Sequence, residues 1–173
     1  SDTNNGIRGH TWRAKFGLDT ASPSVTVTAP GSSANVRGSS VTVSATASDN
    51  VGVLGVRFKV DGSYVGNEDT SSPYGITWDT TGLTDGAHSI TAVARDAAGH
   101  TTTSSAVSVT VDNSSPSVSV TSPANSTRVA GTIAVSASAS DNISVAEVQL
   151  QLDGANLGAE DTSSPYSVNW NTT

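Results

Sequence analysis

The sequence contains an internal repeat, and this repeat constrains the fold more than any other feature. The seven residues Glu68–Tyr74 (Glu-Asp-Thr-Ser-Ser-Pro-Tyr) return unchanged as Glu160–Tyr166. A tryptophan follows four residues after each copy, at Trp78 and Trp170. The offset of 92 residues in a chain of 173 indicates structural units of about 90 residues.

Apolar and polar residues alternate in seven short segments between residues 23 and 115, and turn residues separate these segments. A period of two is typical of half-buried strands, and seven such strands at regular spacing favour a β-sandwich. No segment has the 3.6-residue period of a helix, so the predicted fold class is all-β. The inward positions predict a core that includes Val43, Ala45, Val56, Phe58, Ile76, Trp78, Ala92 and Val109.

The pattern begins again at Pro116 and stops at Thr173, before the positions of the last two strands. We therefore expect residues 23–115 to form a complete sandwich and residues 116–173 an incomplete one. Loss of two strands would leave the apolar side chains of the third strand facing water. An open apolar edge of this kind invites pairing with another chain. The residues concerned are Val148, Leu150 and Leu152.

Residues 1–22 resemble the end of a preceding repeat. The segment 16–23 matches the segment 109–116 in pattern, and residues 10–18 alternate like a strand. Two interpretations stay open: residues 1–22 are the tail strand and linker of a preceding repeat, or they are a donor strand that enters the open second repeat of another copy. In the second case the donor side chains are Trp12, Ala14, Phe16 and Leu18.

Short motifs recur at matching places in both repeats. They include Ala-x-Ala-Ser-Asp-Asn after the second strand, Asp-Gly after the third, and Ser-Ser-Pro-Tyr before the tryptophan. The first repeat adds Asp-Gly-x-His and Ala-Arg-Asp-Ala-Ala-Gly-His around its sixth strand. Together these motifs make residues 23–173 resemble the bacterial immunoglobulin-like repeats of large secreted and surface proteins. The resemblance implies tandem immunoglobulin-like β-sandwiches, the second without its last two strands, and an extracellular or cell-surface location.

Composition argues against several classes of function. The net charge is −7 with only 8 Lys and Arg residues, which disfavours binding to nucleic acid and to anionic lipid. No apolar run is long enough for a membrane helix, so no membrane insertion is expected. The chain has no cysteine, which excludes disulfides and thiolate metal sites.

Titratable residues give no pattern of an active site. The three histidines, His10, His88 and His100, are far apart in sequence and are predicted to be solvent-exposed turn residues. The Glu-Asp pairs that begin at Glu68 and Glu160 precede a proline in both repeats, which favours turn formation over acid–base catalysis. We therefore expect no enzyme activity.

Four aspartates, Asp19, Asp49, Asp96 and Asp112, fall at predicted turns near the ends of the sandwich. Asp19 and Asp112 occupy equivalent positions just before each repeat. Two interpretations stay open for the four: side-chain capping of turns, or ligation of Ca²⁺, which takes six to eight oxygen ligands. No other cofactor is expected.

These observations favour a structural module of an extracellular stalk, fibre or surface-protein array. Its partners would be neighbouring modules or copies of itself, and strand donation is one mode of assembly. The alternative is a carbohydrate-binding or adhesive accessory module of a larger secreted protein, acting on polysaccharide. Tyr64 with Trp12 is its candidate aromatic pair, and Asn156 replaces Tyr64 in the second repeat.

Overall fold

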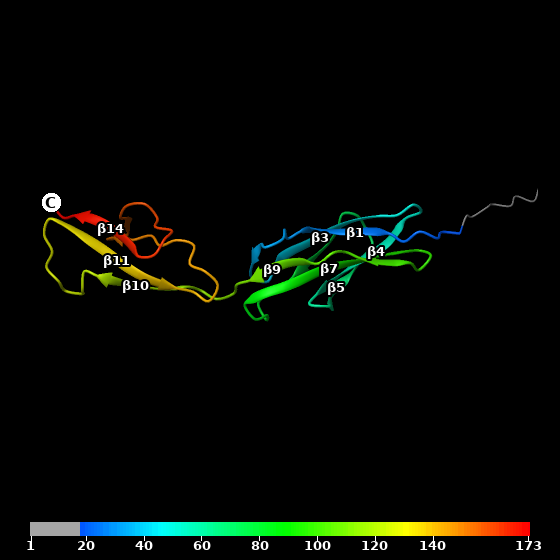
Figure 1. Cartoon of the computed structure of the whole chain (residues 1–173), viewed down its shortest axis with the longest axis horizontal. Coiled ribbons are helices and arrows are strands. Elements are labelled where there is room, and N and C mark those ends of the chain that lie inside the picture. Colours follow the sequence, from blue (N-terminus) through cyan, green and yellow to red (C-terminus); the bar gives the residue numbers. More distant parts are fainter. Residues whose placement is uncertain (1–17) are drawn as a thin grey trace, which may run out of the picture.

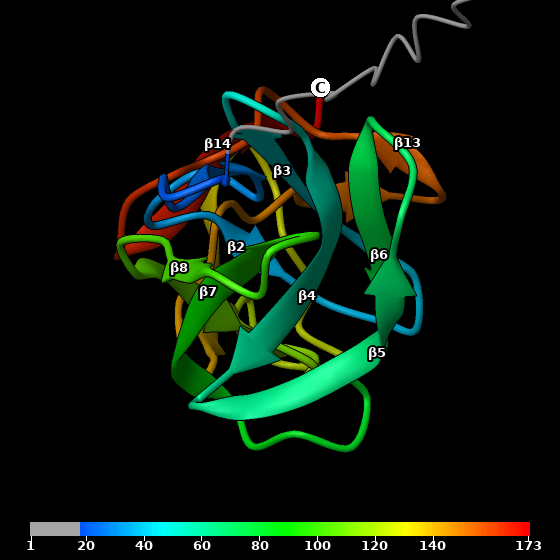
Figure 2. The ribbon, with the colours of Figure 1, turned by 90° about the vertical axis from the view of Figure 1, so that its right-hand side faces the viewer.

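The computed structural model describes residues 18–173, and the regular elements within this range are all β-strands. The strands form two units that lie end to end along the long axis of the molecule (Figure 1). Figure 2 looks along this axis, with the first unit nearer to the viewer. The all-β fold class is confirmed. Within the described range, no helix is long and apolar enough to cross a membrane.

The first unit contains two sheets. One is a three-stranded antiparallel sheet in the order β1-β3-β6, formed by β1 (Ser24–Ala29), β3 (Val41–Ser48) and β6 (Tyr74–Trp78). The other is six-stranded, follows the order β2-β9-β7-β4-β5, and has β8 paired to β7. Its strands are β2 (Asn35–Val36), β4 (Val53–Val60), β5 (Ser63–Asp69), β7 (Gly86–Asp96), β8 (Thr101–Thr103) and β9 (Val107–Val111).

The core of the first unit lies between these two sheets. Along β4 and β7, every second side chain points inward and is buried, because successive residues of a strand face opposite sides. Phe58 has no exposed surface. Of the eight core residues predicted from the sequence, Ile76 is half-buried against the core and the other seven are buried: Val43, Ala45, Val56, Phe58, Trp78, Ala92 and Val109.

The repeated loop is closed by its aspartate in both units. Asp69 accepts hydrogen bonds from the backbone N–H of Ser71 (3.0 Å) and of Gly75 (2.8 Å). Asp161 accepts the equivalent bonds from Ser163 (3.1 Å) and Ser167 (3.0 Å). The prediction that these aspartates serve the turn is therefore confirmed.

The second unit retains the first sheet and loses most of the second. Its three-stranded sheet has the order β10-β11-β14, which corresponds to β1-β3-β6. The strands are β10 (Ser117–Ser122), β11 (Thr132–Ser140) and β14 (Tyr166–Asn171), and a short hairpin joins β12 (Gln151–Leu152) to β13 (Ala155–Asn156).

The prediction that Val148 and Leu150 face water is wrong. Both are buried, in a small cluster with Ala137 and Tyr166, whereas Leu152 is exposed as expected. Residues 143–150 have no adjacent strands to pair with and form no strand, although Val148 makes an isolated bridge to Asp161. Because this segment is not held in a sheet, it folds over β11 and buries its own apolar side chains.

The apolar surface left open in the second unit lies on β10 instead. Val118 is 65% exposed and Val120 is 61% exposed. Their counterparts in the first repeat, Val25 and Val27, are 9% and 8% exposed. Within residues 18–173 no counterpart of the six-stranded sheet packs against β10, so these two side chains are uncovered.

Candidate functional site

Asp85, in the turn before β7, connects the two units and forms the first candidate site. Its Oδ1 accepts a hydrogen bond from the backbone N–H of Asn113 (2.6 Å). Its Oδ2 accepts from the Ser114 hydroxyl (2.5 Å) and from the Asn142 side-chain amide of the second unit (2.7 Å). These donors, the Ser114 hydroxyl first and then the Asn113 N–H, lower the pKa of Asp85 below its usual value.

The linker between the units is also fixed to the first unit by Asn113. The side-chain amide of Asn113 donates to the carbonyl of Thr80 (2.7 Å), and its Oδ1 accepts from the hydroxyl of Thr80 and the N–H of Gly38 (both 3.2 Å). The N–H of Asp112 donates to the carbonyl of Val36 (3.1 Å). Three successive linker residues, 112 to 114, are thus held before the second unit begins.

The opposite end of the first unit carries a cluster of ionisable groups. The side chain of Asp96 is fully buried and accepts from the N–H (2.9 Å) and the ring Nδ1 (2.8 Å) of His100. Burial acts to raise the pKa of Asp96, but the hydrogen bonds from His100 outweigh it, and the pKa is lowered. Asp19 lies beside them, with one ligand atom of each residue within 4.8 Å of the others.

Asn50 connects Asp49 to this cluster. With its amide nitrogen facing the carboxylates, Asn50 donates to Asp49 (3.2 Å) and to Asp19 (3.2 Å). Asn50 and Asn142 are equivalent residues, and each donates to a carboxylate on the linker or unit that precedes its own repeat. The recurring Ser-Asp-Asn motif therefore contacts the segment or unit that precedes it in both repeats.

Asp112 does not join the other three aspartates that the sequence analysis grouped with it. It lies at the linker end, where it lines a shallow hollow with Asn35, Val36 and Arg37. Its Oδ1 is buried and has no hydrogen-bond partner within the described residues. The four aspartates thus divide between the two ends of the first unit, and calcium binding stays a prediction.

If Ca²⁺ binds at Asp19 and Asp96, we expect the melting temperature of the first unit to be higher in millimolar Ca²⁺ than in EDTA. A ligand that binds only the native state stabilises by mass action, about 2.7 kcal/mol at 100 times Kd. The Asp19→Asn variant should lose this difference and Asp112→Asn should keep it. Differential scanning calorimetry makes the comparison, and identical melting in both buffers would exclude the metal.

His88 is not the solvent-exposed turn residue that the sequence predicted. Its side chain is 10% exposed, and its ring nitrogens bond Asp61 (2.7 Å) and the carbonyl of Thr84 (2.9 Å). These contacts, the Thr84 carbonyl first, raise the pKa of His88, and the His88 ring lowers the pKa of Asp61. His100 is likewise paired with Asp96, and His10 lies outside the described residues.

The two repeated glutamates have different surroundings. Glu68 forms a two-point ion pair with Arg95 (2.5 and 2.7 Å), and this guanidinium lowers the pKa of Glu68. Glu160, in contrast, lies beside Glu147 and raises its pKa. Within residues 18–173 Glu160 forms no ion pair with a cation, and neither Glu68–Asp69 nor Glu160–Asp161 is arranged as an acid and a base across a cleft.

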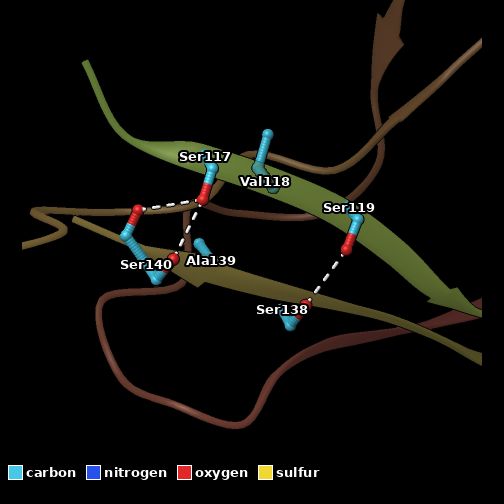
Figure 3. A pocket seen from close by; sticks show the side chains of 6 residues that line it. All are labelled: Ser117, Val118, Ser119, Ser138, Ala139 and Ser140. Carbon is cyan, nitrogen blue, oxygen red and sulfur yellow. Dashed lines mark hydrogen bonds between the residues drawn. The ribbon is translucent and has the colours of Figure 1, made fainter.

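A hollow on β10 and β11 is lined by Ser117, Ser119, Ser138 and Ser140, with Val118 and Ala139 (Figure 3). The hydroxyls of Ser117 and Ser140 bond each other across the strands (2.9 Å), as do those of Ser119 and Ser138 (3.1 Å). Ser24 and Ser48 make the same contact in the first repeat (2.8 Å). The hydroxyls satisfy one another, and no basic group among the hollow's lining residues activates them as nucleophiles.

The predicted donor strand falls almost entirely outside the described residues, which exclude Trp12, Ala14 and Phe16. Leu18 is exposed and is not part of a strand. Strand donation therefore stays a prediction, and the apolar surface available to it includes Val118 and Val120 as well as Leu152.

Comparison with known proteins places the chain in a family. A family model described as "Bacterial Ig domain" matches residues 23–92 and 116–173. The chain belongs to this family. It is also similar to a solved structure of Clostridium thermocellum CbhA fibronectin(III)-like modules, with 27% sequence identity and a TM-score of 0.55. That match covers 87% of this chain and 80% of the other. No curated protein matches.

The bacterial Ig domain family and the fibronectin(III)-like modules agree with the sandwich architecture. Such modules are typically non-catalytic, and they commonly occur in extracellular or surface proteins. A fold of this kind does not itself specify a function, so the function must be argued from particular residues. The residues at the junction and on the outer faces of the sheets provide that argument.

Proposed function

We propose that the chain is a structural module of an extracellular stalk, fibre or surface array, in which successive bacterial Ig domains are held at a fixed angle. The observation that carries this proposal is the Asp85 carboxylate, which accepts hydrogen bonds from the linker and from the next unit. A spacer holds its two ends apart only if the joints between its modules resist bending. Connections between domains are mobile by default unless contacts across the joint hold them.

The distribution of chemistry supports the same proposal. Hydrogen-bonding side chains gather at both ends of the first unit, around Asp85 at the junction with the second unit and around Asp96 at the opposite end. The β10–β11 surface carries hydroxyls that bond each other. This arrangement supports a repeating building block whose specific contacts are made to its neighbours in the array.

The test is the Asp85→Ala variant, which removes the acceptor for three donors. We expect the two units to bend relative to each other, so that small-angle scattering shows a broader distribution of intramolecular distances. In ¹⁵N relaxation the units should tumble with separate correlation times. The matched control is Asp79→Ala. Asp79 is exposed and caps its own turn through Thr81.

This control should leave both measurements unchanged, because Asp79 bonds within its own turn and not to the linker or the second unit. Equal scattering and equal relaxation for the parent and the Asp85→Ala variant would refute the proposal that this carboxylate fixes the joint. Loss of folding would be visible as loss of the near-ultraviolet circular dichroism of Trp78, and it is not expected because Asp85 lies outside the core.

A polysaccharide-binding accessory module is the second candidate function. The observation that favours it is the outer face of the six-stranded sheet, where Tyr64 is 47% exposed beside Arg57 and Lys59. The pairing of an aromatic ring with two cations on this face favours an anionic sugar over a neutral one.

A further inference from the structure

Most of the positively charged side chains in the described part of this acidic chain lie on the outer face of the six-stranded sheet. Five of the eight Lys and Arg residues lie in the described range, and three of these five are on β4 and β7. Arg57 and Lys59 are two apart on β4, so they share the face opposite Phe58. Arg95 lies on β7, where it pairs with Gly55 of β4.

Tyr64 of β5 lies directly across from Lys59 in the sheet. The Arg57 guanidinium carbon is 3.9 Å from the centre of the Tyr64 ring, and the Lys59 Nζ is 4.6 Å from it. The negative face of an aromatic ring attracts cations at these distances. The ring thus fixes two positive groups that would otherwise repel each other.

The two cations on β4 have no anionic partner in the described part of the chain. Within residues 18–173 neither Arg57 nor Lys59 forms an ion pair or a side-chain hydrogen bond. The Arg95 guanidinium is different, because it is paired with Glu68 at two points. This pair needs Gly55, since a Cβ there would lie 2.7 Å from the Glu68 carboxyl carbon.

Beside Lys59 lies a shallow hollow of about 230 Å³, lined by Arg57, Tyr64, Glu68, Val93, Arg95 and Thr101. Its lining is apolar at Val93, carries hydroxyls on Tyr64 and Thr101, and includes the Arg57 guanidinium, while Glu68 is already paired with Arg95. Pockets for drug-sized ligands occupy roughly 300–1,000 Å³. This hollow is smaller, and its volume suits a single sugar ring. The open sheet face on either side leaves room for an extended chain.

The second repeat shows that the fold does not require this face. Gln149, Gln151 and Asn156 occupy the positions of Arg57, Lys59 and Tyr64. Gln151 and Asn156 hydrogen-bond each other across their hairpin (3.1 Å), so a neutral pair replaces the cation–ring pair. The inward positions of the same strand stay apolar in both repeats, which separates the needs of the core from those of the outer face.

We propose that the Arg57–Lys59–Tyr64 face binds an acidic polysaccharide, with one carboxylated sugar ring in the hollow between Tyr64, Val93 and Thr101. The guanidinium and the ammonium pair with carboxylates, and the two hydroxyls bond sugar hydroxyls. This inference is independent of the spacer role, because it involves neither Asp85 nor the linker.

The experiment titrates the whole chain with an α-1,4-linked galacturonic acid hexamer and follows ¹⁵N–¹H chemical shifts. We expect shifts concentrated on β4, β5 and β7, and a dissociation constant that rises with salt. A triple variant, Arg57→Gln with Lys59→Gln and Tyr64→Asn, places the residues of the second repeat on the first. It should weaken binding about tenfold or more and leave the melting temperature nearly unchanged.

The matched control is Arg37→Gln with Arg128→Gln, which removes the same number of positive charges from other surfaces and should bind like the parent. Three results would each overturn the proposal: no shifts at about 10 mM hexamer, parent-like binding by the triple variant, or equal binding of a neutral hexasaccharide. Equal binding of poly-glutamate would also overturn it, because the face would then be a general anion site. None of these results alters the expectation for Asp85→Ala.

Discussion

Replacing Phe58 with alanine is expected to lower the free energy of unfolding of the first repeat by about 3–5 kcal/mol. Phe58 has no exposed surface and lies between the two sheets, on a strand paired on both sides. Its removal leaves a cavity that close-packed neighbours fill only in part. Urea denaturation followed by the fluorescence of Trp78, which is in the same core, measures the change.

Leu54 on the same strand supplies the control. It is 41% exposed, so Leu54→Ala should change stability by no more than about 0.5 kcal/mol. Leu150 occupies the position of Phe58 in the second repeat but belongs to a much smaller cluster. Its replacement by alanine should cost less than that of Phe58. A loss below about 1 kcal/mol for Phe58→Ala would show that the core is assigned to the wrong face of β4.

The strands of the first repeat and their buried faces were predictable because alternation with period two reports directly which side of a strand is apolar. Val43 and Phe58 are examples, and both are buried. Alternation does not report whether a neighbouring strand is there to pair with. For this reason the sequence predicted exposure at Val148 and Leu150, which the structure buries, and missed the exposure of Val118 and Val120.

The junction was harder to predict because its parts are far apart in the chain. Asp85, Asn113 and Asn142 lie in three separate connecting segments, and only the folded chain brings them together. The sequence nevertheless contained an indication of these contacts. Asp-Gly-x-His and Ser-Asp-Asn are turn motifs, and both hold more polar residues than a turn requires. The same holds for His88, whose partner Asp61 comes from the Asp-Gly turn after β4.

The cationic face could be predicted in part by comparing the two repeats. Comparison of the two repeats position by position separates residues that the fold retains from residues that differ. Tyr64 was identified in this way as unrepeated, but its pairing with Arg57 and Lys59 follows from strand register. That register places Tyr64 opposite Lys59, and the bulge in the β4–β5 pairing makes the exact partner difficult to derive from sequence.

Acid should destabilise both repeats, and we expect the melting temperature to fall as the pH is lowered below about 4. Backbone hydrogen bonds, from Ser71 in one loop and Ser167 in the other, lower the pKa values of Asp69 and Asp161. A carboxylate whose pKa is lower in the folded state stabilises at pH values above its unfolded pKa, about 3.9. That stability is lost as the pH falls through the folded pKa. Glu147, whose pKa is raised by Glu160, acts in the opposite direction.

The titration of His88 is expected to set the pH above which stability declines. Its pKa is raised in the folded state, so its contribution is complete below the unfolded value of about 6.5 and is lost as the pH rises through the folded pKa. Maximum stability is therefore expected between about pH 4 and 6.5, which calorimetry across pH 2–9 would measure.

Asp69→Asn should reduce the acid dependence of the first repeat alone, and Asp161→Asn that of the second alone. His88→Gln should remove the decline above pH 6.5. A melting temperature that stays constant from pH 6 to pH 3 would contradict the assignment of these aspartates as charged acceptors, because protonation would then cost the fold nothing.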